Sequence, residues 1–423
     1  MRSILFAFCL ILAFKALAKS PDYEDRLLDL EAQVSSLQNK LEATKNMAEQ
    51  ERPSAFNPSI SVVGDLMGQY GFDPSAKKQK KHGHHHAHPH SHSHGAAHSH
   101  DHGSVHKHPD EFQSGVYVRE VEFEFRGAID PWADAMVAVA VHQHGVGGKW
   151  DIHVEEAYAR LKQWPGLNYA PLGIEIKAGL FKTAIGRMNR MHLHNVPQVT
   201  FPLALQTFLG EEGYGAAGLS LSTSFALGQK SALTVFLEGV MGNALRMQQE
   251  GATKVPNGIA HAWFHQELAD GHYLDLGASA LFGRRGEKKS GLFTLLGGDV
   301  HYSYTPAGFG QDPIFLFGGE LFAADRKAQT PWALGGFTWA QTRLVGSSFF
   351  GVRWDVAPLE DAGDYQHALG AYIGYYTTEF LRFRFGYEHV MPKLNSFAGD
   401  HRFMLSMNFV LGSHPVEPYF INR

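Results

Sequence analysis

Apolar and polar residues alternate one for one over long segments of this chain, and this period of two limits what it can fold into. The clearest segment lies near the C-terminus, where the apolar positions are Phe403, Leu405, Met407, Phe409 and Leu411. Successive side chains of a β-strand point to opposite faces, so each such segment has one apolar and one polar face. Strands of about ten residues with this division suit a wall between lipid and water.

The same alternation recurs about sixteen times along the chain. We expect strands at 59–71, 114–128, 133–145, 150–162, 172–183, 211–226, 230–243, 259–268, 271–284, 289–304, 312–325, 331–345, 347–357, 364–377, 379–391 and 399–412. Sixteen is an even number in the size range that encloses an aqueous channel. The predicted fold class is therefore all-β: a transmembrane antiparallel β-barrel over 53–412, preceded by a short periplasmic α-helical coiled coil.

The N-terminal residues have a different character. Residues 1–18 combine Arg2, an apolar run and a small-x-small site at Ala16-Leu17-Ala18, which predicts a signal peptide cut before Lys19. The only cysteine, Cys9, lies in this segment, so we expect no disulfide and no thiolate metal site in the mature chain.

Residues 19–52 predict the coiled coil. Their apolar positions recur at alternating spacings of three and four, at Tyr23, Leu27, Leu30, Val34, Leu37, Leu41, Thr44 and Ala48. Such a heptad seam favours a homotrimer whose barrels also touch, with a monomer as the alternative. A single amphipathic helix packed on its own protein is another reading of the same pattern. Residues 413–423 are predicted to be a C-terminal periplasmic tail.

The predicted connections differ in length with strand parity. If the first strand starts in the periplasm, connections after odd-numbered strands face outward, and these include the long segments 72–113 and 184–210. Connections after even-numbered strands are mostly tight, as at Asp130-Pro131 and Asp270-Gly271. We therefore expect 72–113 to be an extracellular loop and 184–210 to be a constriction loop, because long connections are usually functional and the third outward loop of general porins narrows the lumen.

The first of these loops carries half of the histidines of the chain. Thirteen of its 26 histidines lie between His82 and His108, at His82, His84, His85, His86, His88, His90, His92, His94, His98, His100, His102, His106 and His108. Imidazoles interleaved with Gly, Ser, Ala and Pro cannot bury a core, but neutral imidazole binds zinc, copper and nickel. The run predicts loose capture of metal, while a bland spacer or a pH-sensing tail remain alternatives.

The second loop carries Arg187, Arg190, His192 and His194, with Glu211 and Glu212 just beyond it. The His-x-His pair and two nearby carboxylates could complete a cation site. The alternative is that these imidazoles form hydrogen bonds within a packed loop. For this segment, membership of a pore constriction is favoured over metal ligation.

Charged side chains are also expected along the inner wall. Three glutamates, Glu120, Glu122 and Glu124, fall on the polar face near the front of the barrel, and three arginines, Arg382, Arg384 and Arg402, come from strands that close against the first. Opposed acidic and basic rows across a pore would favour small charged solutes. Cross-strand ion pairing that merely holds the wall is equally compatible with the sequence.

Other functional classes have no support in the sequence. The formal charge of −5 with neutral histidines argues against a nucleic-acid partner. No nucleophile elbow, Walker loop or HExxH motif occurs, so we do not predict an enzyme, and no organic cofactor is expected.

A resemblance to a known family rests on five stretches of sequence. They are FNPSISVVGD at 56–65, REVEFEFRGAIDPWADAMVAVAV at 119–141, VEEAYARL at 154–161, IKAGLFKTAIGRMNRMHLHNVP at 176–197 and FLGEEGYGAAGLSLS at 208–222. This region resembles bacterial proteins identified as zinc-regulated outer-membrane receptors, which implies an association with zinc. A coiled coil ahead of sixteen strands is also similar to phosphate-selective porins. Energised receptors have about twenty-two strands and an internal plug, and the residues before the first strand cannot supply a plug, so we expect passive transport.

The sequence thus predicts a porin of the bacterial outer membrane that admits divalent metal, zinc above all, either transported or loosely bound. Its expected partners are metal ions, outer-membrane lipid and two further copies of itself. The alternatives are a porin for phosphate or other anions, and a surface metal-binding or adhesive protein that uses the barrel only as an anchor.

Overall fold

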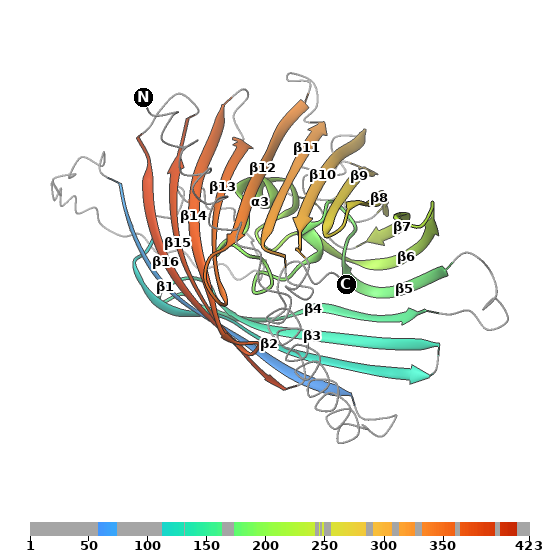
Figure 1. The fold of residues 1–423 in the computed structure, drawn as a ribbon, viewed down its shortest axis with the longest axis horizontal. Helices are drawn as coiled ribbons and strands as arrows, with labels where there is room; N and C mark the ends of the chain where they lie inside the picture. The colour runs from blue at the N-terminus through green and yellow to red at the C-terminus, as the bar shows by residue number, and fades with distance from the viewer. Residues whose placement is uncertain are drawn as a thin grey trace, which may run out of the picture. The chain divides into compact units, whose positions relative to one another are not determined.

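The protein is a closed antiparallel β-barrel of sixteen strands in which each strand pairs with its neighbours in sequence and β1 closes against β16 (Figure 1). The computed structural model describes residues 58–73, 112–130, 132–162, 173–241, 245, 248, 255–284, 291–306, 313–325, 332–359, 364–393 and 398–412. The predicted signal peptide, the coiled coil, the thirteen-histidine run and the C-terminal tail lie outside these residues.

All sixteen predicted segments coincide with strands, so the predicted sixteen-stranded antiparallel barrel is confirmed. The strands are β1 Ser59–Phe72, β2 Gly115–Asp130, β3 Ala133–Gln143, β4 Trp150–Leu161, β5 Gly173–Lys182, β6 Gly215–Ala226, β7 Ser231–Met241, β8 Asn257–Ala269, β9 His272–Arg284, β10 Leu292–Tyr304, β11 Phe315–Asp325, β12 Trp332–Arg343, β13 Ser348–Pro358, β14 Tyr365–Thr378, β15 Leu381–Met391 and β16 Asp400–Gly412. The start of β6 differs most from its prediction, 211–226, because Gly213 has a φ of +81° and belongs to the preceding loop.

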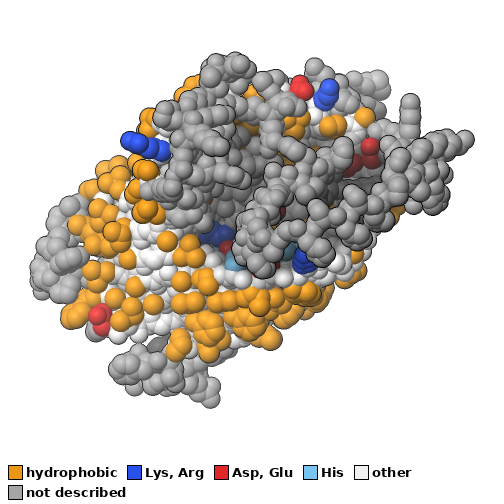
Figure 2. All heavy atoms as spheres, turned by 180° about the vertical axis from the view of Figure 1, so that it is seen from behind, with side chains coloured by type: hydrophobic (Ala, Val, Ile, Leu, Met, Phe, Trp, Pro, Cys, Tyr) orange, Lys and Arg blue, Asp and Glu red, His pale blue; other side chains and the backbone are white. Residues whose placement is uncertain are grey.

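The outer face of the wall is apolar. In β16, Leu405 and Leu411 are 53% and 61% exposed, whereas Ser406 and Asn408 between them are buried. Hydrophobic side chains cover much of the outer surface in Figure 2. A closed ladder leaves no unpaired strand edge, and an apolar exterior needs lipid around it. The barrel therefore resides in the bacterial outer membrane. No helix in the described ranges is long and apolar enough to cross a membrane.

The two ends of the barrel differ in their connections. Strands joined at one end, here called the turn end, are mostly linked by tight turns, such as 227–230, 270–271 and 379–380. The opposite end, here called the loop end, has the connections that follow odd-numbered strands, including 73–114 and 183–214. Two connections at the turn end, 162–172 and 305–314, are longer than the alternation predicts.

Two β-bulges turn additional charged side chains into the barrel. In β4, Val139 of the neighbouring strand pairs with Val154 and Ala138 pairs with Glu156, so that Glu155 is an extra residue. Both Glu155 and Glu156 are consequently buried on the inner side of the wall. A second bulge, in β2, leaves Arg119 as the extra residue beside Asp65 of β1.

Residues 183–214, here called the inner loop, run through the inside of the barrel (Figure 1, green). They include a short 3-10 helix, η1 (Met188–Arg190), and the helix α3 (Leu203–Leu209). The apolar side chains of α3 contact an apolar part of the inner wall, where Phe208 lies 5.4 Å from Phe322 between ring centroids. The hydrophobic core of this barrel therefore lies between the inner loop and one side of the wall.

Candidate functional site

The two ends of the inner loop are joined by one buried amide. Asn189 donates from Nδ2 to the carbonyl oxygens of Thr183 (2.9 Å) and Tyr214 (3.1 Å). In return, the backbone N–H of Tyr214 donates to Asn189 Oδ1 at 2.6 Å. The loop therefore starts and ends at the same point of the wall, although its middle crosses the lumen.

The first residues of the loop are bound by inward side chains of three strands, β7, β9 and β11. The backbone N–H of Ala184 donates to Glu238 of β7 (2.9 Å), that of Gly186 to Ser279 of β9 (3.0 Å) and that of Met188 to Glu320 of β11 (2.6 Å). Gly186 has a φ of +66°, and a Cβ at this position would lie 2.1 Å from a carboxylate oxygen of Glu320. The path of the chain here requires glycine.

The far side of the loop is bound by arginines of β15. Arg384 donates from Nη1 to the carbonyl oxygens of Val196 (2.9 Å) and Gln198, and Arg382 donates to the carbonyl oxygen of His194. Both arginines are almost completely buried. The prediction that these two residues face an acidic row across a pore is therefore wrong, because the inner loop lies over them and accepts their hydrogen bonds.

The acidic row of β2 faces the histidines of the loop. The two ring nitrogens of His192 lie 2.9 Å from Glu122 Oε2 and 3.0 Å from Glu156 Oε1. His194 Nδ1 lies 3.2 Å from Glu120 Oε1. The predicted pairing of these histidines with carboxylates occurs, but the carboxylates come from the barrel wall rather than from Glu211 and Glu212.

The surroundings of His192 favour the protonated form of its imidazole. Burial by itself would lower its pKa, but the charges of Glu122 and Glu156 and their hydrogen bonds to the ring raise that pKa well above its usual value. A protonated imidazole has no lone pair for a metal. Beside this ion pair, His194, Glu120 and Glu122 bring three possible donor atoms within 4.8 Å of one another.

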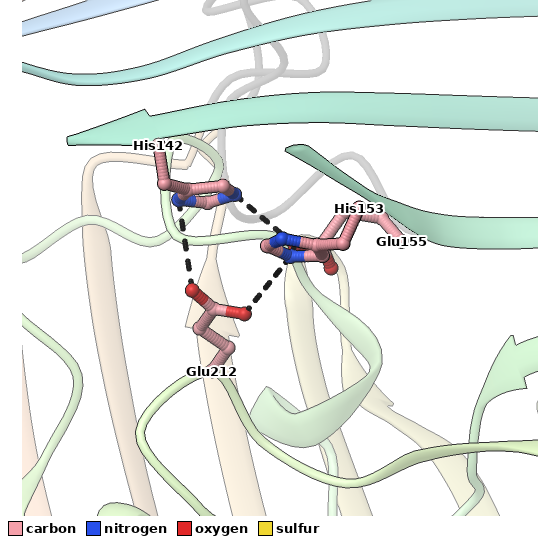
Figure 3. Close-up of side chains that lie close together, drawn as sticks. All are labelled: His142, His153, Glu155 and Glu212. Carbon is pink, nitrogen blue, oxygen red and sulfur yellow. Dashed lines mark hydrogen bonds and ion pairs between the residues drawn. The ribbon is translucent and has the colours of Figure 1, made fainter. Parts of the chain in front are cut away.

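A second group of imidazoles and carboxylates lies at the loop end of the same wall (Figure 3). His153 Nε2 is 2.7 Å from Glu155 Oε1 and 3.3 Å from Glu212 Oε2, while His142 Nδ1 is 3.6 Å from Glu212 Oε1. Glu212, which follows the predicted loop, thus meets two strand histidines that the sequence analysis did not single out. The clues were His142 near the end of β3 and the HVEE motif, His153 to Glu156, near the start of β4.

Below the inner loop, toward the turn end, the lumen holds a cavity of about 570 Å³. Its charged lining residues are Glu124, Arg126, Glu156, Arg160, Glu175, Lys177, Lys182, Arg187, Arg190 and Asp299. Arg187 also forms an ion pair with Asp275 at 2.8 Å, and the Arg190 guanidinium lies 5.0 Å from the ring centre of Phe236. The two predicted loop arginines therefore do face a water-accessible space.

The remaining predicted pore residues have local partners. Glu124 lines the cavity and forms a close ion pair with Arg126 on the same strand. Arg402 is partly exposed, 3.6 Å from Asp400, with its guanidinium 4.9 Å from the ring centre of Phe112.

Residues 213–218 read G-x-G-x-x-G, a motif that can bind a dinucleotide where it leads from a strand into a helix. Here it leads from the inner loop into β6, so it does not form a dinucleotide site.

No protein-family model and no curated protein matches the chain. Among solved structures, the chain is similar to the outer-membrane channel DcaP of Acinetobacter baumannii, with 10% identity, a TM-score of 0.50, and coverage of 84% of this chain and 97% of the other. It is also similar to the anion-selective porin of Comamonas acidovorans (8% identity, TM-score 0.50, coverage 84% and 99%). A third is OmpF of Salmonella typhi (11% identity, TM-score 0.50, coverage 85% and 99%). These likenesses establish that the fold is that of outer-membrane porins.

Proposed function

We propose that this barrel is a passive outer-membrane channel for divalent metal ions, with zinc as its main substrate. In this proposal the histidine run, 82–108, lies outside the cell and raises the local metal concentration, and the inner loop forms the constriction. Metal ions then move down their gradient without coupling to an energy source.

The observation that carries this proposal is the line of imidazoles and carboxylates between the inner loop and strands β2 to β4. His142, His153, Glu155 and Glu212 form one cluster, and Glu120, Glu122, Glu156 and His194 lie where the inner loop meets β2 and β4. Imidazole and carboxylate are ligands that suit zinc. Conduction also requires several weak sites rather than one tight cage, and these groups are spread over two clusters.

A second candidate function, passage of anions, is favoured by the cavity below the loop. Its lining includes Arg126, Arg160, Lys177, Lys182, Arg187 and Arg190 against only four carboxylates. A basic cavity raises the local concentration of anions. It would suit phosphate, or a metal ion that enters as an anionic complex.

Reversal potentials in planar bilayers separate the two candidates. Under a zinc chloride gradient, a channel for zinc gives a potential with the sign of cation selectivity, and an anion porin gives the opposite sign. We expect the double variant Arg187→Ala/Arg190→Ala to move the potential further toward cations, because it removes two positive charges from the cavity.

Arg284→Ala is the matched control for this variant, because Arg284 is exposed at the end of β9 and does not line the cavity. The control should leave the reversal potential unchanged. The zinc assignment would be wrong if the wild-type channel were anion-selective with every zinc salt and if liposomes that contain it took up no zinc.

A further inference from the structure

The geometry points to a binding site for a divalent transition metal formed by His142, His153, Glu155 and Glu212 at the loop end of the lumen (Figure 3). Binding of the metal at this site does not depend on transport. Its role as the entry step for metal in transit rests on the proposed function.

The four side chains offer two nitrogen and two oxygen donors that converge. All four donor atoms lie within 4.8 Å of one another. A zinc ion with bonds of about 2.0–2.2 Å holds tetrahedral ligands about 3.3 Å apart. With one atom from each residue, two of the existing contacts are close to that value: His153 Nε2 to Glu212 Oε2 at 3.3 Å and His142 Nε2 to Glu155 Oε1 at 3.4 Å. A third contact, from His153 Nε2 to Glu155 Oε1, is only 2.7 Å, so these two side chains would move apart to hold a metal ion between them.

One donor atom in this group has no hydrogen-bond partner within the described part of the chain. His142 is only 7% exposed, and its Nε2 atom forms no hydrogen bond of good geometry, although Glu155 Oε1 lies 3.4 Å away at ion-pair distance. Buried polar atoms are almost always satisfied, so an unsatisfied one needs an explanation. A metal ion bound between His142 and Glu155 would replace this long contact with two direct bonds.

Lys182 contacts both the carboxylate of Glu155 and the backbone at Glu212. Its ammonium group lies 3.0 Å from Glu155 Oε2 and donates to the backbone carbonyl of Glu212 at 2.7 Å. The other oxygen of Glu155 is thereby directed toward the two imidazoles. Such outer contacts orient the ligands of known metal sites. Two carboxylates and one ammonium leave one net negative charge to attract a cation.

The site is open on one side. The side chains of Glu212 and His153 are 44% and 32% exposed, whereas those of His142 and Glu155 are 9% and 7% exposed. A metal can therefore enter past the exposed pair. Two imidazoles select zinc, copper, nickel or cobalt over magnesium and calcium, which prefer oxygen ligands.

The bulge in β4 links this site to the deeper part of the lumen. Glu155 belongs to the site, and the next residue, Glu156, contacts His192 and lines the cavity below the loop. Adjacent carboxylates, one in the site and one at the cavity, would let a metal ion pass from one to the other.

Chemical footprinting of the purified full-length chain tests the site directly. Diethylpyrocarbonate modifies unliganded imidazole, and trypsin releases residues 150–160 as a peptide in which His153 is the only histidine. We expect buffered free Zn²⁺ to protect His153, and Mg²⁺ at the same concentration to leave it reactive. His144, with a side chain 61% exposed and outside the cluster, should react equally with and without zinc.

Two adjacent glutamates provide a matched pair of variants. Glu212→Gln removes a ligand, and Glu211→Gln changes an exposed neighbour that is not in the cluster. We expect Glu212→Gln to raise the zinc concentration for half-protection of His153 by about tenfold to a hundredfold or more, as loss of even an outer contact does in other sites. The Glu211→Gln variant should match the wild type.

Three results would overturn the site. Zinc could leave the reactivity of His153 unchanged, it could protect His144 as well as His153, or it could protect His153 in Glu212→Gln as well as in the wild type. Zinc flux into liposomes that contain a zinc-sensitive dye tests the proposed function separately. Protection of His153 without flux would retain the site and reject the channel function, and flux without protection would do the reverse.

Discussion

Replacement of Arg384 by Met should release the far side of the inner loop. The guanidinium donates to the carbonyl oxygens of Val196 and Gln198, and its other nitrogen donates to Ser406 at 3.0 Å. A hydrogen bond to a charged group contributes about 1.5–3 kcal/mol, so the two bonds to the loop together stabilise the docked state by about 3–6 kcal/mol. Arg382 remains as a second donor to Val196 at 3.4 Å, which places the loss nearer the lower value.

A loss of about 3 kcal/mol raises the population of the open loop roughly a hundredfold, since each 1.4 kcal/mol is a factor of ten. Trypsin can report this opening, because Arg187 and Arg190 are the only trypsin sites in the inner loop. In the wild type, both sites lie inside the barrel, and cleavage requires local opening. We expect Arg384→Met to be cut within the loop about a hundred times faster while the barrel stays heat-resistant on gels.

Arg402→Met is the control for this experiment. Arg402 lies on the neighbouring strand, and its recorded partners among the described residues are Asp400 and Phe112 rather than the inner loop. Its loss should leave cleavage at the wild-type rate. If Arg384→Met is also cut at the wild-type rate, the apolar packing of α3 alone holds the loop, and the arginine argument is refuted.

Three further predictions test other parts of the chain. Deletion of 82–108 should leave a heat-resistant barrel with less bound zinc, measured by equilibrium dialysis; failure to fold would contradict the loop assignment. Replacing Leu30 and Leu37 with Asp should weaken a trimer detected by cross-linking without unfolding the barrel, and an unchanged pattern would mean that the helix packs elsewhere. Gly186→Ala should speed loop cleavage by trypsin, because the positive φ of +66° costs about 1–3 kcal/mol and a carboxylate occupies the position of the new Cβ. Gly145→Ala is the control. Gly145 has a φ of +76°, a Cβ added there would meet no atom within 4 Å, and the residue lies outside the inner loop, so this variant should not affect cleavage.

The strands and their faces could be predicted from the sequence because a strand in a lipid-facing wall has a strict local rule. Each residue faces either lipid or lumen, and the alternation records this choice without reference to any distant residue. The inward direction of Glu120 and Glu122 and of Arg382 and Arg384 follows from that rule. The length of the connection after the fifth strand likewise marked it as a loop with a role, since a turn needs only a few residues.

What those inward side chains contact was decided only by the tertiary structure. The bulge in β4 breaks the local rule, so the alternation alone would send Glu155 and Glu156 to opposite faces, whereas both enter the lumen. Glu212 joins histidines about 60 and 70 positions earlier in the chain because the inner loop returns to the wall beside β3 and β4. Pairings of this kind depend on where a closed ladder brings distant segments together, and no pattern within a single segment encodes them.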